Sequence, residues 1–320
     1  MISTSWPETG SLAKAAYSGH TAGMDRPHDI LCIGSVLWDV IGRAGAVMRV
    51  GSDVPGRITR LPGGVAMNIA MTLRRFSLQP VLLTAIGRDE EGEELIAAAE
   101  RLGMSTEFVY RSDDLPTDLY MAVEGANGLI AAIADAHSLE ASGDKILRPL
   151  ADGRLGSSDD PFAGLVALDG NLTEDLLAEI SQSPLFASAD LRVAPASPGK
   201  AERLLPLLSC PNATIYVNLE EACVLCQDTF NSAEDAVREM LRRGAANALV
   251  TDGGRMASHG SADGVITAEP AQVLVTRVTG AGDTFMAAHI AAEARGEDHE
   301  TALRTALKAA ADYVSGDVRT

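Results

Sequence analysis

Cysteine is scarce in this chain of 320 residues, which contains only 4. A secreted fold held by disulfides has more cysteines in a shorter chain, so such a framework is excluded. Cys223 and Cys226 have the spacing of half a zinc or redox site, but no second pair and no histidine stands at ligand spacing from them. We therefore expect free thiols and a reducing, cytoplasmic environment.

Cations are also in short supply, because 26 Lys and Arg residues face 44 Asp and Glu residues, a formal net charge of −18. Such a field repels the phosphates of nucleic acids and the surfaces of anionic membranes, so neither is an expected partner. The same field opposes a polyphosphate such as ATP. A chain that binds ATP must therefore hold the phosphates locally, with backbone amides, a helix N-terminus and Mg²⁺.

Residues 1–27 have neither a basic start nor a sustained apolar run, which excludes a signal peptide or a membrane span in this segment. We expect a poorly ordered leader there, and Met24 could be an alternative start of translation. The whole chain is 46% hydrophobic and 22% charged, as is typical of a soluble globular protein. We expect one large domain over residues 28–320.

Short apolar runs alternate with longer amphipathic segments along most of the chain. The expected strands are 30–33, 38–41, 81–86, 165–168, 189–193, 214–217, 248–251 and 273–278, and the expected helices are 66–76, 91–102, 173–180, 200–207, 220–226, 233–243, 283–294 and 300–314. This alternation predicts a mostly parallel sheet with helices on both faces. Two stretches without helices, 42–61 and 108–133, are expected to form a small second sheet that acts as a lid.

The Gly-x-Gly-x-x-Gly turn of dinucleotide-binding folds is missing, because the first strand is followed by Gly34-Ser35-Val36-Leu37. A nicotinamide-dependent dehydrogenase is therefore disfavoured. A different glycine-rich turn, Thr279-Gly280-Ala281-Gly282-Asp283, precedes an apolar helix. Small residues there let a phosphate approach the free N–H groups of a helix start, which makes an anion hole.

Asp283 at the end of this turn could accept the proton of a hydroxyl that attacks the γ-phosphate of ATP. The same string also fits a structural helix start with Asp283 as its cap. Spacing alone leaves both interpretations open.

Several segments resemble motifs of the PfkB, or ribokinase-like, family of carbohydrate kinases, and the resemblance extends over most of the chain from Asp29 onward. Residues 278–285 resemble the C-terminal signature of the family, and 61–68 (LPGGVAMN) its N-terminal signature. Asn218-Leu219-Glu220-Glu221 is similar to its Asn-x-x-Glu motif, and 251–254 (TDGG) falls where its nucleotide-contacting turn lies. Each segment alone also fits a turn or a helix cap, and the joint order of the segments is what supports the resemblance.

The resemblance implies an α/β fold, a ribokinase-like three-layer α/β/α sandwich with a mostly parallel central sheet and a small β-sheet lid. It implies ATP and Mg²⁺ as cofactors and transfer of the γ-phosphate to a hydroxyl of a sugar or nucleoside. The implied site comprises Asp283 as catalytic base; Gly280, Ala281 and Gly282 as anion hole; Asp39, expected at or just beyond a strand end, with Gly63, Gly64, Asn68, Thr117 and Asp135 for the substrate; Asn218, Thr251, Gly253 and Thr279 for the nucleotide; and Glu221 for Mg²⁺ through water.

Three further segments, 116–123, 133–140 and 168–173, resemble pseudouridine kinases and imply the 5′-hydroxyl of pseudouridine as acceptor. A kinase for ribose, adenosine or inosine, or a 2-keto-3-deoxy sugar acid is the alternative. A non-catalytic sugar- or nucleoside-binding protein of the same fold is a further alternative, against which the intact Gly282-Asp283 pair argues.

Two positions depart from the family pattern. Leu37 stands two residues before Asp39, where Asn is usual, so one polar contact to the sugar is missing. Arg277 stands six residues before Asp283, where ribokinases have an Asp that ligates a monovalent cation. A guanidinium cannot ligate potassium but supplies a permanent positive charge, so we expect activity that is independent of potassium. The open edges of the lid also suggest a homodimer through the lid.

Overall fold

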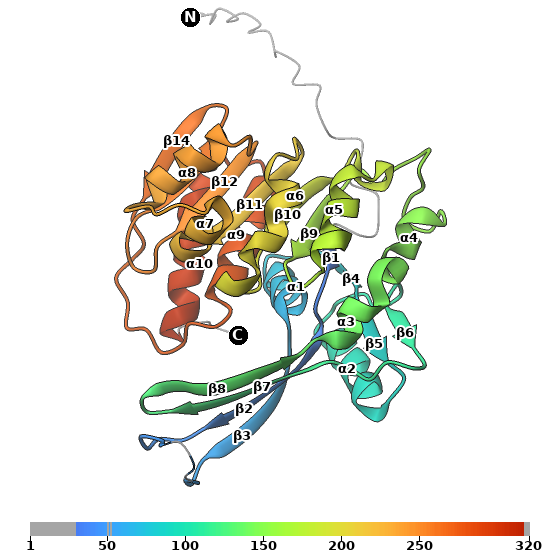
Figure 1. The fold of residues 1–320 in the computed structure, drawn as a ribbon, viewed down its shortest axis with the longest axis vertical. Helices are drawn as coiled ribbons and strands as arrows, with labels where there is room; N and C mark the ends of the chain where they lie inside the picture. The colour runs from blue at the N-terminus through green and yellow to red at the C-terminus, as the bar shows by residue number, and fades with distance from the viewer. Residues whose placement is uncertain (1–29, 50, 52, 317–320) are drawn as a thin grey trace, which may run out of the picture.

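The structure, a computed structural model, describes residues 30–49, 51 and 53–316, and the leader predicted at 1–27 lies outside them. At its centre is an eight-stranded sheet in the order β14-β13-β12-β11-β10-β9-β1-β4 (Figure 1). Its strands are β1 (Ile30–Ile33), β4 (Pro80–Leu83), β9 (Leu165–Asp169), β10 (Asp190–Ala194), β11 (Ala213–Asn218), β12 (Asn247–Thr251), β13 (Ala257–Ser261) and β14 (Gly264–Ala268). The six strands from β12 to β4 are parallel, as predicted, and β13 and β14 are antiparallel.

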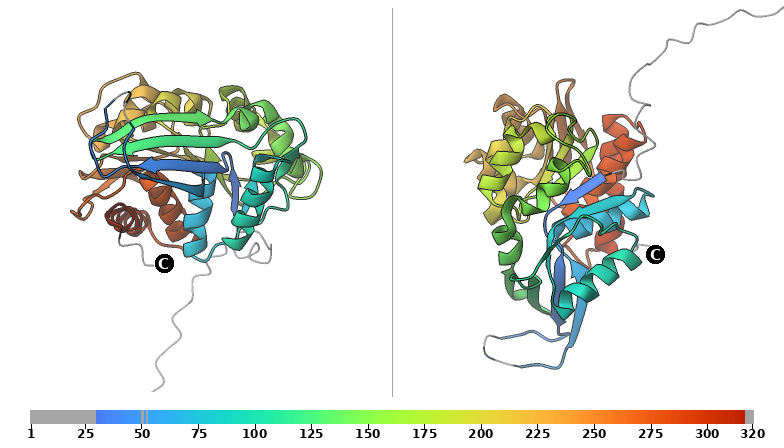
Figure 2. Two further views of the ribbon diagram at one scale, coloured as in Figure 1. Left: turned by 90° about the horizontal axis from the view of Figure 1, so that it is seen from below. Right: turned by 90° about the vertical axis from the view of Figure 1, so that its right-hand side faces the viewer.

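Helices cover both faces of this sheet, so the body has three layers (Figure 2). One layer contains α1 (Val65–Arg75), α2 (Glu90–Arg101), α9 (Ala281–Ala294) and α10 (His299–Ser315). The other contains α3 (His137–Ser142), α4 (Arg148–Ala151), α5 (Glu174–Gln182), α6 (Leu205–Leu208), α7 (Leu219–Cys226) and α8 (Ala233–Arg242), with 3₁₀ segments at Gly143–Leu147, Pro184–Phe186 and Pro198–Leu204. The predicted three-layer α/β/α arrangement is confirmed.

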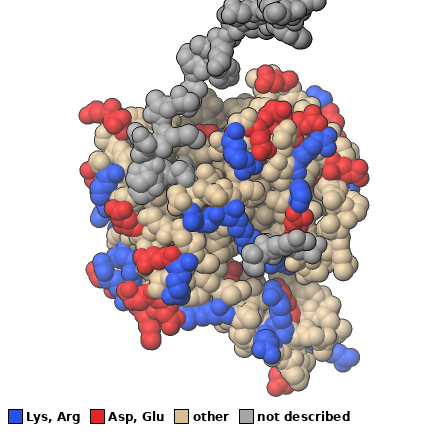
Figure 3. Space-filling view, turned by 180° about the vertical axis from the view of Figure 1, so that it is seen from behind, with Lys and Arg blue, Asp and Glu red and all other residues tan. Residues whose placement is uncertain are grey.

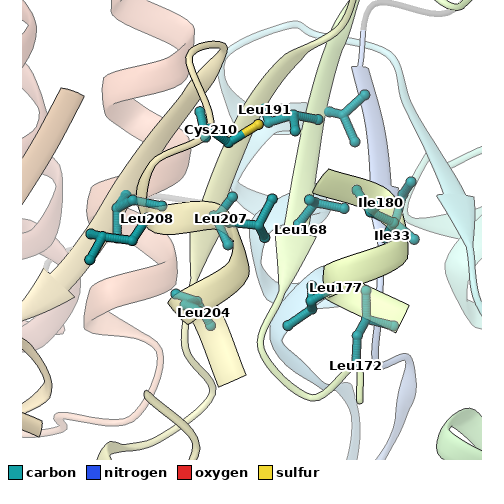
Figure 4. Close-up of a cluster of buried hydrophobic side chains, with 14 of the residues drawn as sticks. Ile33, Leu168, Leu172, Leu177, Ile180, Leu191, Leu204, Leu207, Leu208 and Cys210 are labelled. Carbon is teal, nitrogen blue, oxygen red and sulfur yellow. The ribbon is translucent and has the colours of Figure 1, made fainter. Parts of the chain in front are cut away.

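Two apolar clusters fill the spaces between the sheet and the helical layers. Strand β1 contributes to both, because Leu31 and Ile33 point into one cluster while Ile30 and Cys32 point into the other, and all four are fully buried. A strand that is buried on both faces needs such a continuous apolar run. Figure 4 shows part of the first cluster, where side chains of the sheet meet those of α5 and α6.

The surface and the thiols agree with the composition. All four cysteines are free thiols, as predicted. Seen from behind, acidic and basic side chains are interspersed over the body (Figure 3). Across the part of the chain that the structure describes, no helix has both the length and the apolar character needed to cross a bilayer.

A four-stranded sheet, which we call the lid, projects from the body at the bottom of Figure 1. Its order is β3 (Arg57–Gly63), β2 (Leu37–Arg43), β7 (Leu119–Gly125) and β8 (Gly128–Asp135). The lid thus begins at Leu37, before the predicted stretch 42–61. Of the predicted stretch 108–133, the first part lies elsewhere, because β6 (Tyr110–Ser112) pairs in parallel with β5 (Ala85–Gly87) as a separate ribbon.

The prediction of a strand at 273–278 is wrong. The edge of the central sheet is formed by the β13-β14 hairpin, which sequence analysis missed, and 269–279 is an irregular connection from β14 to α9. Its apolar residues are exposed, with Leu274 at 82% and Val278 at 70%. The amides of Thr276 and Arg277 instead donate to the carbonyl of Val314 near the end of α10, at 2.8 and 3.3 Å. The backbone of this run pairs with the end of α10 in place of a strand, and the apolar pattern of the run cannot reveal that contact.

Candidate active site

The candidate site lies at the carboxyl ends of the central strands. Asp169 ends β9, Asn218 ends β11, Thr251 ends β12, and Ser35 follows β1. Strand β1 lies between β4 and β9, so the next two strands of this sheet along the chain lie on opposite sides of β1. In open α/β sheets, ligands bind outside the carboxyl ends of the strands at such a reversal of strand order.

Asp283 lies in the first turn of α9, at the start of which Gly280 adopts a left-handed conformation with φ 86°. No side chain caps this helix, so the interpretation of Asp283 as a cap is wrong. Its carboxylate instead accepts a hydrogen bond from Nδ2 of Asn68 on α1, at 2.9 Å between Nδ2 and Oδ2. Helices α1 and α9 pack together, so two predicted site residues, 215 positions apart in sequence, are in contact.

The surroundings of Asp283 oppose its ionisation. Burial is the main cause that raises its pKa to about 7, and the negative charges of Asp169, Glu221 and Asp39 add to the effect. The hydrogen bond from Asn68 acts in the opposite direction. A carboxylate whose pKa lies near neutrality is suited to take up a proton from a hydroxyl.

The three residues predicted to form an anion hole, Gly280, Ala281 and Gly282, lie at the start of α9. The amide of Ala281 donates to the carbonyl of Val278 at 3.0 Å, so it is engaged within the turn. The amides of Gly282 and Asp283 follow in the first helical turn, where a helix offers no internal acceptor. A Cβ at Gly282 would meet no atom within 4 Å, so no other part of the described chain packs against this residue on that side.

Tyr313 of α10, which sequence analysis missed, holds the loop before the anion hole. Its hydroxyl donates to the carbonyl of Thr279 at 2.8 Å, and a Cβ at Gly280 would lie 2.6 Å from the same hydroxyl oxygen. The guanidinium of Arg277 stacks on the Tyr313 ring, 3.9 Å from its centroid, and Nε donates to the Tyr313 carbonyl at 2.7 Å. Arg277 therefore clamps the loop to α10. Nothing in the sequence around Tyr313 signals this contact.

Asp39 lies within β2, rather than at a strand end as predicted, and its carboxyl group is held against Gly63 of β3. A Cβ at Gly63 would lie 2.1 Å from Oδ2 of Asp39, so any side chain there would displace the carboxylate. Burial raises the pKa of Asp39 to about 6. Gly64, the residue before α1, has φ 95°, and a Cβ there would lie 2.4 Å from the carbonyl oxygen of Ser35. Neither glycine can be replaced without displacing a neighbour, because Asp39 lies against Gly63 and the Ser35 carbonyl lies against Gly64.

A buried network beneath these groups was not assigned a role from the sequence. Asp169 is fully buried and accepts from the amide and the hydroxyl of Ser35 and from the amide of Asn171. The Ser35 oxygen accepts in turn from the amide of Val65, the first residue of α1. Burial raises the pKa of Asp169, while these hydrogen bonds lower it. The segment 168–173 had been singled out only as a family resemblance.

The predicted nucleotide and magnesium residues lie together at the ends of β11 and β12. Asn218 and Glu221 form a capping box at the start of α7, in which each side chain accepts from the backbone amide of the other. Thr251 is paired with Asn218 across the two strands, and Gly253 follows in a turn with φ 56°. Burial is the main cause that raises the pKa of Glu221 to about 7.

Thr117 and Asp135 are not brought to Asp283 in the described residues. Thr117 donates both its amide and its hydroxyl to Asp89, which caps α2. Asp135 ends β8, is exposed, and contacts Nδ1 of His137 at 2.7 Å. Their neighbour Asp118, which sequence analysis missed, is buried and accepts from two amides at the start of α3.

The carboxylate oxygens of the candidate site suit a hard divalent cation. Burial is the first cause that raises the pKa of Asp169, Glu221 and Asp283, and the negative charges of Asp169 and Glu221 raise that of Asp283 further. A cation such as Mg²⁺ prefers carboxylate and water oxygens and would relieve this repulsion. The carboxyl of Glu221, which is engaged with its own cap, would bind such an ion through water.

Comparison with known proteins agrees with this geometry. A profile described as pfkB family carbohydrate kinase matches residues 27–315. A pseudouridine kinase of Arabidopsis thaliana is 24% identical over 242 residues, covering 69% of this chain and 62% of its own length. A pseudouridine kinase of Escherichia coli is 27% identical over 278 residues, covering 81% of each chain.

The structure of an Arabidopsis thaliana ribokinase complexed with ribose and ATP has a TM-score of 0.69 and 19% identity, covering 92% of this chain and 94% of that one. The likeness confirms the predicted ribokinase-like fold with its small separate sheet. Because the family profile spans most of the sequence, the chain belongs to the pfkB family of carbohydrate kinases.

Proposed function

We propose that this protein transfers the γ-phosphate of ATP to a hydroxyl of a sugar or nucleoside, with Asp283 as the base. The observation on which the proposal rests is the position of Asp283 at the open N-terminus of α9, in contact with Asn68 and with a raised pKa. In the proposed reaction the acceptor oxygen forms a bond to the γ-phosphorus, the bond from that phosphorus to the bridging oxygen of ADP breaks, and the acceptor proton passes to Asp283.

The remaining site residues have positioning and electrostatic roles in this proposal. The amides of Gly282 and Asp283 face the transferred phosphoryl group, and the positive end of α9 stabilises its charge. Glu221, with Asn218, would hold Mg²⁺ through water, and the ion would supply positive charge to neutralise that of the phosphates. Thr251, Gly253 and Thr279 border the nucleotide. Asp39, Gly63, Gly64 and Asn68 bind the acceptor on the lid side, and Thr117 and Asp135 border it only after the lid closes.

For the acceptor we propose the 5′-hydroxyl of pseudouridine. Support comes from the segments that contain Thr117, Asp135 and Asp169 and from the two pseudouridine kinases among the relatives. Leu37 is 5% exposed, so the position two residues before Asp39 offers no polar contact to the sugar. Ribose is the second candidate, because the structural neighbour described above is a ribokinase in complex with ribose and ATP.

We further propose that two chains dimerise through their lids. Ile58, Met121 and Ile133 are 77%, 44% and 69% exposed. Cross-strand pairing and the alternation of side chains place these three on the face of the lid opposite to Asp39. An exposed apolar face of this kind on a thin sheet is suited to a second copy of the same sheet.

The dimer predicts that Ile133→Glu converts the protein to a monomer, because a buried unpaired charge opposes association. Analytical ultracentrifugation measures the mass. The matched control is Leu102→Glu, which alters an exposed leucine at the end of α2. A wild-type monomer, or an Ile133→Glu dimer as tight as wild type, contradicts the lid interface.

Asp283→Asn is expected to lower kcat by about 10²- to 10⁴-fold, the usual contribution of a positioned base, with little change in ATP affinity. Turnover with ATP and Mg²⁺ is measured on pseudouridine, ribose, adenosine, inosine and a 2-keto-3-deoxy sugar acid. Asp175→Asn, at an exposed position in the first turn of α5, serves as the control. Turnover that survives Asp283→Asn overturns the mechanism, whereas turnover of ribose but not of pseudouridine overturns only the choice of acceptor.

The raised pKa of Asp283 predicts two opposite pH effects. For kcat/KM the base must be ionised, so the rate rises with pH through about 7, the value to which burial raises this pKa. Stability moves the other way, because the folded chain keeps this proton at a pH where the unfolded chain has lost it. The stability of the ligand-free protein therefore falls between about pH 4 and pH 7.

Thermal unfolding of ligand-free wild type and Asp283→Asn tests the second effect. The melting temperature of the variant minus that of wild type is expected to increase from pH 5 to pH 8, because the amide has no proton to lose. A difference that stays constant or shrinks over this range shows that the fold does not disfavour the ionised carboxylate.

Activity is expected to be independent of potassium, because Arg277 places a permanent cation where ribokinases have a cation ligand. Turnover is compared in potassium chloride and in the chloride of a large inert cation at constant ionic strength. Arg277→Gln, which removes the charge, should lower turnover equally in both salts. Loss of most wild-type turnover in the inert salt refutes the expectation.

A further inference from the structure

Three histidines and a glutamate from distant parts of the chain meet at the end of α9 opposite to Asp283. His289 and Glu293 are one turn apart on α9, His259 is on β13, and His299 is the first residue of α10. At 1.5 Å of rise per residue, His289 and Glu293 lie about 9 and 15 Å along the helix from Asp283. The cluster is therefore separate from the candidate active site.

The two inner imidazoles have nitrogen atoms without partners. His259 and His289 are 2% and 0% exposed. Both ring nitrogens of His259, and Nε2 of His289, lack a hydrogen-bond partner within the described residues. Buried polar atoms are nearly always paired, so three unpaired nitrogens in one place call for a bound species. The rings meet edge to face, with centroids 5.2 Å apart.

Neighbouring side chains fix the orientation of His289 and Glu293 by hydrogen bonds, as commonly happens to residues that bind a metal. Nδ1 of His289 lies 2.9 Å from the hydroxyl of Tyr216. When Nδ1 donates to that oxygen, the lone pair remains on Nε2, the nitrogen without a partner. Arg192 contacts both the Tyr216 hydroxyl and Oε2 of Glu293. Oε1 of Glu293 lies 3.0 Å from Nδ1 of His299.

The chemistry of the donors also suits a cation. Imidazole nitrogens and a carboxylate oxygen are among the ligands that zinc takes in proteins. The charge of Arg192 is already balanced by Asp190 and Glu293.

We propose that His259, His289 and Glu293 bind a divalent transition metal of the zinc class, with His299 as the fourth ligand. One ligand atom from each of the first three lies within 4.8 Å of the others. Tetrahedral zinc with bonds of about 2.0 Å holds its ligand atoms about 3.3 Å apart, so small ring rotations close the difference. Imidazole with one carboxylate favours zinc over magnesium or calcium.

His299 gives the metal a route in, because its side chain is 43% exposed while the other two imidazoles are buried. Its ring lies 4.5 Å from that of His259 between centroids. A metal held by these four groups joins the β13-β14 hairpin, at the edge of the sheet, to α9 and α10. The site is therefore structural, and its presence does not depend on which acceptor the enzyme uses.

Cobalt(II) is a spectroscopic probe for such a site and is titrated into metal-free full-length protein in excess Mg²⁺. We expect one equivalent to bind and give a visible ligand-field band. His259→Leu should abolish the band. The melting temperature of the metal-free protein should not fall, because the imidazole of His259 has no hydrogen-bond partner to lose. Tyr216→Phe, which removes the partner of His289, should weaken binding by about 10- to 100-fold.

Controls separate this site from other histidines. His137→Leu, on an exposed histidine, and a double variant of His20 and His28 should each keep the band and its affinity. The proposal is overturned if wild type gives no band, or if the band persists unchanged in His259→Leu, which would place cobalt elsewhere. It is also overturned if Tyr216→Phe and His137→Leu weaken binding equally.

Discussion

The hydroxyl of Ser35 is the contact on which the site depends. It donates to Asp169 at the end of β9 and accepts from the amide that begins α1, so it joins β1, β9 and α1 at the point where strand order reverses. Helix α1 then carries Asn68 to Asp283. Asp169 is buried, so removal of the Ser35 hydroxyl would leave its carboxyl group without one of its donors. An unpaired buried polar group costs more free energy than a single hydrogen bond contributes.

Crowding of acidic groups is the second constraint. Asp39, Asp169, Glu221 and Asp283 are held at one crevice in a chain with net charge −18, and the fold opposes ionisation of each of them. Burial is the first cause of each shift, and at Asp283 the charges of the other three carboxylates add to it. A bound cation would favour the ionised forms. Buried carboxyl groups whose ionisation is disfavoured lower the stability of the fold, and proteins commonly tolerate such a cost at sites that carry activity. Because these carboxylates repel phosphates, an acidic protein of this kind could hold a polyphosphate only through local groups such as backbone amides and a bound cation.

Much of this could be predicted from the sequence, and the failures have physical causes. The buried strands β1 and β9 to β12 and the amphipathic helices follow from local patterns, and the signatures gave Asp283, Asn68, Asp39 and Gly63. The exposed run 273–278 is not a strand because the amides of Thr276 and Arg277 pair with the end of α10, a contact that a local pattern does not reveal. Tyr313 and Ser35 were missed because their roles arise from contacts with residues far away in sequence. Thr117 was placed by resemblance, whereas its hydrogen bonds serve the cap of α2.

The attachment of the loop before α9 to the last turn of α10 has a practical consequence. Thr276, Arg277 and Thr279 are all held by Tyr313 and Val314, so the glycine-rich turn before α9 is tied to the end of α10. A purification tag, surface linker or fusion partner joined directly after α10 could disturb the contacts of Tyr313 and Val314 with residues 276–279. Strand β1 starts at the amino end of the parallel strands, opposite to the carboxyl ends where the candidate site lies, so an attachment preceding it is the safer choice for immobilising this protein.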